Sequence, residues 1–114
     1  MLPNKYRLKN KKDFEKVFKK GKSFKEDFLI LKIVPNNSNQ IRFGFIISQK
    51  TSKKATLRNK LKRRISEILR LKIEKMKKGI DAILIALPGI EKKDFWEIEE
   101  IVKNLFKKAE VLNL

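Results

Sequence analysis

The chain of 114 residues contains no cysteine and no histidine. It therefore cannot form disulfides or use thiol chemistry, and it lacks the commonest general base and metal ligand of proteins. No stretch is long and apolar enough to span a membrane, and the N-terminus lacks the apolar core of a signal peptide. These absences exclude most catalytic mechanisms that depend on protein side chains, and they predict a cytoplasmic protein that does not contact a membrane.

Acidic residues are scarce, because 13 Asp and Glu stand against 30 Lys and Arg, for a formal net charge of +17. The cations are concentrated in residues 1–25, with ten against two acids, and in residues 50–78, with thirteen against two. Residues 26–49 are balanced, whereas residues 79–114 hold five cations and seven acids. A Lys-rich coding bias would not remove the compensating acids, so the two basic blocks favour nucleic acid over a membrane surface as the partner.

Residues 54–72 are predicted to form an amphipathic helix around which the chain is organised. Five apolar side chains share one face at helical spacing: Leu57, Leu61, Ile65, Ile68 and Leu69. The opposite face carries Asn59, Arg63, Ser66, Glu67 and Arg70, and two cationic pairs flank it, Arg58 with Lys62 and Lys60 with Arg64. Such a density of cations repels itself unless a polyanion neutralises it, so the helix is predicted to lie on phosphate. Thr56 is a possible N-cap, and the helix can continue to about Lys78.

A shorter helix is predicted over residues 11–20, between an N-cap at Asn10 and a stop at Gly21. Its apolar face consists of Phe14, Val17 and Phe18. This spacing is more typical of packing against a core than of a ligand site, and both interpretations are kept at this point. Residues 1–9 are expected to form a loosely held basic arm, and residues 110–114 a loose tail.

Three segments are predicted to be strands. Residues 28–34 and 41–48 are rich in β-forming residues and are joined by a polar turn, which predicts an antiparallel hairpin. Lys32 interrupts the first of these strands and indicates an edge or solvent-facing position. The third strand, residues 81–87, is almost wholly apolar, as expected for a strand inside a sheet with both faces covered.

The last helix is predicted to begin after Asp94, where Glu97 completes a capping box. Its apolar face consists of Phe95, Ile98, Ile101, Val102, Leu105, Phe106 and Ala109. Its acids scatter around the helix, which disfavours a metal or acid–base site at Glu97, Glu99, Glu100 and Glu110. The order of elements predicts a single α+β domain over residues 1–114, with helices packed on one small sheet.

The basic helix, placed between two strands, carries the run Arg58-Asn59-Lys60-Leu61-Lys62-Arg63, followed by Ser66-Glu67. This run resembles the Arg-Asn-Arg-x-x-Lys-Arg type signature of the protein subunit of bacterial ribonuclease P. Further matches are Arg7-Leu8-Lys9, Asp13-Phe14, Val17-Phe18, Gly21, Phe28, Gly44 and Asp81. The resemblance covers roughly residues 3–109, and its strength lies in the order and spacing of the matches.

The sequence departs from the family pattern at several positions. Lys60 replaces an Arg, which keeps the charge but loses the planar fork for bidentate phosphate contact. Ser66 stands where the family usually has Arg, and Arg64 where an apolar residue is common. Leu31 stands where some members have Tyr, and the loop over residues 49–54 is one residue longer than usual.

The resemblance implies an α+β fold with a small mixed four-stranded sheet and three helices, in the order α-β-β-β-α-β-α. It adds a short first strand near residues 22–25. It also implies a left-handed βαβ crossover at the basic helix, against the general handedness rule.

The resemblance also implies a function. The protein would be one subunit of a ribonucleoprotein endoribonuclease, with one protein per RNA, that removes the 5′ leader of precursor tRNA. The RNA subunit would perform the hydrolysis with Mg²⁺ at its own active site, and no catalytic or metal-ligating residues are expected in the protein. The residues expected to bind the catalytic RNA are Arg58, Asn59, Lys60, Lys62, Arg63, Arg7 and Lys9. Those expected to bind the single-stranded leader, by stacking and charge, are Phe14, Phe18, Leu31 and Lys32.

Three other functions compete with this interpretation. A ribosomal or other structural RNA-binding protein would carry the same basic helix but would not affect precursor cleavage. An architectural DNA-binding protein is disfavoured because no recognition-helix, zinc or minor-groove pattern is present. A stand-alone protein nuclease is disfavoured by the missing His, Cys and convergent carboxylates.

Overall fold

The computed structural model describes residues 2–47, 49–51 and 53–112. The predicted order α-β-β-β-α-β-α is confirmed, with three helices and a mixed four-stranded sheet. The helices and strands are α1 (Lys11–Lys20), β1 (Lys22–Glu26), β2 (Leu29–Pro35), β3 (Ile41–Ile47), α2 (Ala55–Lys72), β4 (Ile80–Ala86) and α3 (Phe95–Lys108). Three single-turn 3₁₀ helices lie at Asn4–Tyr6, Ile73–Lys75 and Ile90–Lys92.

The strand order across the sheet is β1-β2-β4-β3, so the predicted hairpin between β2 and β3 is wrong. β2 instead pairs antiparallel with β1 and with β4, while β3 and β4 are parallel. Ala82 of β4 lies opposite Ile33 on one side and Phe43 on the other, which confirms the inner position predicted for β4. The apolar β4 lies between β2 and β3, and α2 provides the crossover that the parallel pair of β3 and β4 needs.

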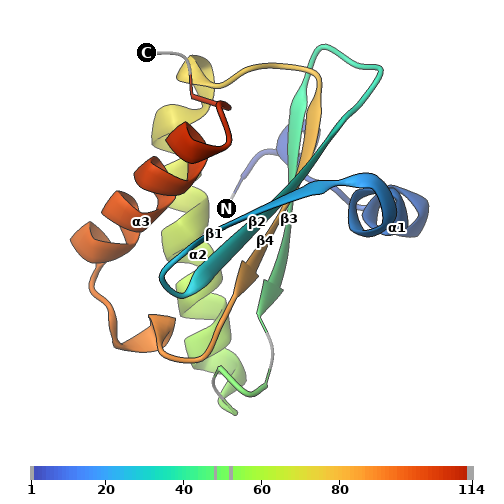
Figure 1. Ribbon diagram of the computed structural model, residues 1–114. Coiled ribbons are helices and arrows are strands. Elements are labelled where there is room, and N and C mark those ends of the chain that lie inside the picture. The colour runs from blue at the N-terminus through green and yellow to red at the C-terminus, as the bar shows by residue number, and fades with distance from the viewer. Residues whose placement is uncertain (1, 48, 52, 113–114) are drawn as a thin grey trace.

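The two faces of the sheet are covered unequally. α2 and α3 pack on one face, and α1 packs on the other, near β2 and β4 (Figure 1). The main core lies under α2 and α3 and includes Phe43, whose ring stacks on Phe106 of α3 with 6.1 Å between centroids. A smaller cluster lies under α1 and contains Leu8, Val17, Val34 and Ile83. Because α1 covers only part of its face, the sheet keeps an accessible side next to it.

The ends of α1 and α3 form as the sequence predicts. The Asn10 side chain accepts a hydrogen bond from the Lys12 amide, and Asp94 and Glu97 form a reciprocal capping box. Gly21 ends α1 with an ordinary negative φ of −74°. A Cβ atom at this position would lie 2.3 Å from the Val17 carbonyl oxygen, so the glycine is needed for close approach of the backbone.

The basic helix differs from its prediction at both ends and on one face. α2 ends at Lys72, short of the predicted Lys78, and its N-cap is Lys54 rather than Thr56. Leu57 is 44% exposed because the first turn lies outside the main core. Ser66, predicted to face outward, is only 2% exposed. It lines a pocket together with Leu2 and other residues of the N-terminal segment.

Both chain ends are packed within the described residues, so the predictions of a loosely held arm and tail are wrong there. Leu2 and Leu8 are buried, and the Leu8 amide donates to the Phe43 carbonyl at 2.8 Å, which extends the sheet beyond β3. Val111 is buried, and Leu112 forms an isolated bridge with Met76. Hydrophobic anchors spaced among charged residues therefore hold both segments in place.

Candidate nucleic-acid interface

The N-terminal half of α2 carries Asn59 and four cations. Asn59, Lys60 and Arg63 are exposed, whereas Arg58 and Lys62 are half-buried. A shallow hollow of about 360 Å³ is lined by Thr56, Asn59, Lys62 and Arg63. We call Arg58, Asn59, Lys60, Lys62 and Arg63 the basic face of α2. It combines long-range positive charge with one directional amide, and these groups match the phosphates and sugars of a nucleic acid.

The C-terminal half of α2 is less positive because Glu67 neutralises Arg70. Two hydrogen bonds join them, from Nε at 3.1 Å and from Nη2 at 2.6 Å. The hydrogen bond from Arg70 lowers the pKa of Glu67 and, in return, raises the pKa of Arg70. Both groups therefore stay charged at neutral pH and satisfy each other, so the net positive charge is concentrated in the first half of the helix.

The N-terminal segment adds two more cations to this region. The Arg7 Nε atom donates to the Leu2 carbonyl oxygen at 2.6 Å, which fixes the guanidinium group against the segment's own backbone. Lys9 Nζ donates to the Asn4 side chain at 3.0 Å. The bridge between Arg7 and Phe43 places both cations beside the outer edge of β3.

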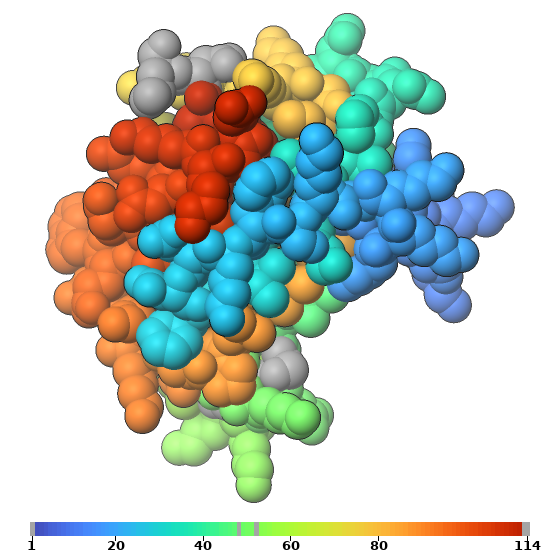
Figure 2. Space-filling model, in the orientation of Figure 1, coloured from blue at the N-terminus to red at the C-terminus, as the bar shows by residue number. Residues whose placement is uncertain are grey.

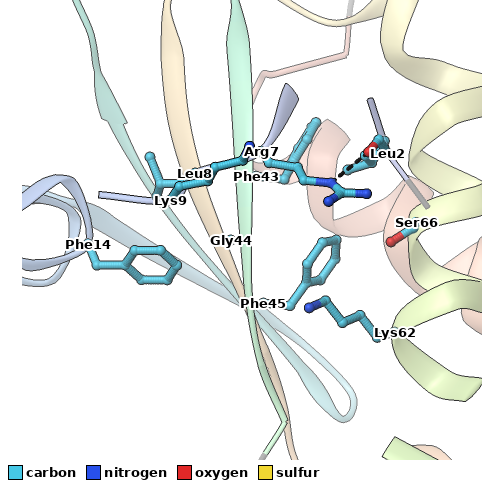
Figure 3. Close-up of a pocket in the computed structure, with 10 residues that line it drawn as sticks. All are labelled: Leu2, Arg7, Leu8, Lys9, Phe14, Phe43, Gly44, Phe45, Lys62 and Ser66. Atoms are coloured by element: carbon cyan, nitrogen blue, oxygen red, sulfur yellow. Dashed lines mark hydrogen bonds between the residues drawn. The ribbon is translucent and has the colours of Figure 1, made fainter. Parts of the chain in front are cut away.

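One pocket of about 230 Å³ joins the N-terminal segment, β3, α1 and α2 (Figure 3). It is lined by Leu2, Arg7, Leu8, Lys9, Phe14, Phe43, Gly44, Phe45, Lys62 and Ser66. Three residues predicted to bind the catalytic RNA, Arg7, Lys9 and Lys62, therefore meet one predicted leader residue, Phe14. We call this the arm pocket.

Among the lining residues that the sequence did not predict, Phe45 and Ser66 lie beside Lys62. The Phe45 ring lies 5.9 Å from Lys62 Nζ, and Ser66 lies one helical turn beyond Lys62. Phe45 could have been predicted from the alternation of side chains along a strand, because Phe43 and Phe45 must share the face that meets α2. Ser66 could have been found from its spacing of four residues from Lys62, which places both on one side of the helix.

The outer surface of α1 holds the second aromatic group of the predicted leader site. Phe18 is 43% exposed, and Lys32 Nζ of β2 lies 5.5 Å from the centre of its ring. Phe14 packs on β3, where a Cβ atom added to Gly44 would lie 2.4 Å from the Phe14 ring. Figure 2 shows the segment of α1, in blue, projecting at one side of the molecule. An exposed ring beside an ammonium group is suited to hold a base next to its phosphate.

Leu31 does not belong to this surface, and its predicted leader contact is wrong. Its side chain is fully buried in the main core, on the face of the sheet covered by α2 and α3. The neighbouring Lys32 faces α1 because successive residues of a strand point to opposite faces. Lys32 is on an inner strand, so the edge position predicted for it is wrong, and its side chain is half-buried beside Phe18.

A charged network fixes α1 on the sheet. Asp81 is 2% exposed and accepts hydrogen bonds from Arg42 at 2.8 and 2.7 Å and from the Asn36 side chain at 2.8 Å. Arg42 also lies 3.5 Å from the Asp13 carboxylate of α1. The hydrogen bonds that Arg42 donates to Asp81 raise the pKa of Arg42, which keeps the guanidinium charged. This network connects β3 and β4 to the helix that carries Phe14 and Phe18.

The structure offers no protein metal centre in the part of the chain that it describes. No group of three or more His, Cys, Asp or Glu side chains within residues 2–47, 49–51 and 53–112 is arranged to hold a metal ion. Over the same residues, no helix combines the length and apolarity needed to cross a membrane. The surface features that remain are cationic and aromatic, as in proteins that bind RNA.

Comparison with known proteins gives one consistent result. A family model described as Ribonuclease P matches residues 2–110. A protein named "Ribonuclease P protein component" from Pseudanabaena is 35% identical over 114 residues, covering 99% of this chain and 98% of its own. Another of that name, from Clostridium kluyveri, is 41% identical over 106 residues, with 91% and 94% covered. The solved RNase P protein of Staphylococcus aureus has a TM-score of 0.88 at 29% identity, with 95% of this chain and 98% of that chain covered.

Proposed function

Because this chain belongs to the bacterial ribonuclease P protein family, and is thus a subunit of a ribonucleoprotein endonuclease, we propose that it binds both RNAs of the processing reaction. The basic face of α2, with Arg7 and Lys9, binds the catalytic RNA subunit. Phe14, Phe18 and Lys32 bind the single-stranded 5′ leader of precursor tRNA. The RNA subunit performs the cleavage, and one protein serves one RNA in the cytoplasm.

The observation that supports this assignment best is the continuity of the two surfaces. The arm pocket joins Lys62 of the basic face to Phe14 of the leader surface around the edge of β3. A leader that leaves the catalytic centre of the RNA would therefore reach α1 without leaving the positively charged surface. The charge attracts phosphates of any sequence, and Phe18 accepts any base by stacking, as a leader of variable sequence requires.

Mg²⁺ enters this proposal only through the RNA. Paired metal ions hydrolyse a phosphodiester by activating water and stabilising the attacking and leaving oxygens, which needs fixed oxygen ligands. The described residues contain no carboxylate cluster suited to that task. The protein side chains therefore bind and orient the substrate, and no metal is assigned to them.

Charge reversal on α2 tests the contact with the catalytic RNA. We expect the double variant K62E/R63E to lose about tenfold or more in affinity for a bacterial ribonuclease P RNA at moderate salt, because two phosphate contacts become repulsions. The matched control is K92E/K107E, which makes the same charge change at two exposed residues on the α3 side. Equal affinities for the two double variants would contradict the assignment.

Photocrosslinking tests the leader surface separately. A precursor tRNA with photoreactive nucleotides in its leader, bound to the assembled holoenzyme, should label α1 at or near Phe18. A variant Phe18→Ala should reduce that labelling without changing assembly with the RNA subunit. Labelling confined to α3 would show that the leader follows a different path.

A further inference from the structure

The arm pocket contains a polar group that the fold leaves without a partner. Ser66 is 2% exposed, and its hydroxyl is the one buried side-chain oxygen or nitrogen among the described residues that has no hydrogen-bond partner. Figure 3 shows this hydroxyl pointing from α2 into the pocket. Buried polar groups are nearly always satisfied, and leaving one unpaired is destabilising, so an orphan hydroxyl in a pocket points to a ligand.

The other groups around the hydroxyl have the charge of an anion site. The lining residues include three cations, Arg7, Lys9 and Lys62, and no Asp or Glu. Arg7 uses only its Nε atom on the Leu2 carbonyl, which holds the guanidinium rigidly and leaves its terminal nitrogens directed toward α2 (Figure 3). A fixed guanidinium loses little entropy when it binds an anion, and its planar fork matches two oxygens of a phosphate.

The pocket also has room for a group larger than water, and it has an apolar floor. Its volume of about 230 Å³ is several times the roughly 30 Å³ share of one water molecule. The Phe45 ring lies beside Lys62 at the base of the pocket (Figure 3). A ribose or base attached to the anion can therefore rest on this ring while the cations hold the charge.

We propose that the arm pocket binds one backbone phosphate of RNA, with the Ser66 hydroxyl donating a hydrogen bond to it and Arg7 and Lys62 balancing its charge. This site rests on the proposed function but adds to it two residues, Ser66 and Phe45, that the proposed function does not include. The phosphate belongs either to the catalytic RNA or to the leader, since the pocket joins the surfaces proposed for both.

The variant Ser66→Ala tests the site because stability and binding should change in opposite directions. Removal of an unpaired buried hydroxyl should leave the urea midpoint unchanged or raise it. Loss of the hydrogen bond to a charged phosphate should weaken RNA binding by about tenfold. The matched control is Ser23→Ala, at an exposed serine of β1 outside the pocket.

Two binding measurements distinguish the sources of the phosphate. Weaker binding of Ser66→Ala to the RNA subunit alone assigns the phosphate to that RNA. Unchanged assembly, with weaker binding of the holoenzyme to a long-leader precursor but not to a leaderless one, assigns it to the leader. Affinities equal to those of Ser23→Ala in both measurements would overturn the proposal.

A third measurement separates failure of this site from failure of the proposed function. Inorganic phosphate, titrated into the free protein at constant ionic strength, should shift the backbone NMR signals of Arg7, Phe45 and Ser66 in wild type and much less in Ser66→Ala. If wild type bound neither RNA, the proposed function would fail, and this titration would still test the pocket. Shifts spread evenly over all surface cations, and equal in the two proteins, would refute the phosphate site.

Discussion

The substitution Asp81→Asn should strongly destabilise the protein, because Asp81 is the buried anion of the charged network that joins α1 to the sheet. Its two oxygens accept from Arg42 at 2.8 and 2.7 Å, and one also accepts from Asn36. An amide in its place would turn an NH₂ group toward the Arg42 guanidinium, so one hydrogen bond is lost and two donors face each other. The charge of Arg42 is then no longer balanced by the nearest carboxylate.

The expected loss follows from the burial of the two partners. Removing one member of a buried ion pair costs about 3–5 kcal/mol. Because the Arg42 side chain is 30% exposed, water replaces part of the lost interaction, and we expect about 2–3 kcal/mol. With a urea dependence of about 1–3 kcal/mol per molar for a small protein, the unfolding midpoint should fall by roughly 0.7–3 M.

Urea unfolding followed by circular dichroism measures this change. The matched control is Glu100→Gln, which removes an exposed carboxylate of α3 and should alter the free energy of unfolding by less than about 0.5 kcal/mol. A loss of less than about 0.5 kcal/mol for Asp81→Asn as well would refute the reasoning, because it would mean that the network does not hold the fold.

Three further changes test other parts of the structure. Gly44→Ala should displace the Phe14 ring and lower the free energy of unfolding by about 1–3 kcal/mol in urea. It should also weaken the holoenzyme's affinity for a long-leader precursor. An unmoved Phe14 in a crystal structure of the variant would contradict this. Arg63→Gln should reduce the slope of log K against log salt for RNA-subunit binding by about 0.7–0.9; an unchanged slope would exclude a phosphate contact. Phe106→Ala removes a fully buried ring stacked on Phe43 and should cost about 3–5 kcal/mol in urea unfolding; a loss below about 1 kcal/mol would contradict the packing.

The elements with strong local signals could be predicted from the sequence. Asn10 and Asp94 begin their helices because a side-chain oxygen satisfies an amide that the helix leaves free. The apolar run of β4 requires cover on both faces, which only an inner strand receives. The basic face of α2 is exposed because so many cations cannot be buried together.

Long-range pairing could not be read from the same local signals. β2 and β3 are adjacent in sequence and joined by a polar turn, which favours a hairpin, but β4 is inserted between them. The sequences of β2 and β3 do not indicate that β4 will lie between them, because the choice of pairing partner depends on contacts between residues distant in sequence. The left-handed crossover implied by the resemblance stays a prediction.

The errors within the candidate site have a local cause. Leu31 and Lys32 were both assigned to the leader surface, although adjacent residues of a strand point to opposite faces. The run around them is almost continuously apolar, so the sequence does not show on which face of the sheet Leu31 lies. The sequence predicts that Ser66 faces solvent because it lies opposite the apolar side chains of its helix, but in the fold it lines a pocket with Leu2, Phe43 and Phe45.

Cleavage of precursor tRNA tests the central claim most directly. A bacterial ribonuclease P RNA at low millimolar Mg²⁺ is assayed with and without this protein, on precursors whose leaders range from one nucleotide to ten or more. The proposed function predicts that the protein stimulates cleavage strongly for long leaders and that the stimulation disappears as the leader is shortened to one or two nucleotides. Stimulation independent of leader length would contradict the leader surface, and no stimulation with tight binding to unrelated structured RNA would contradict the proposed function as a whole.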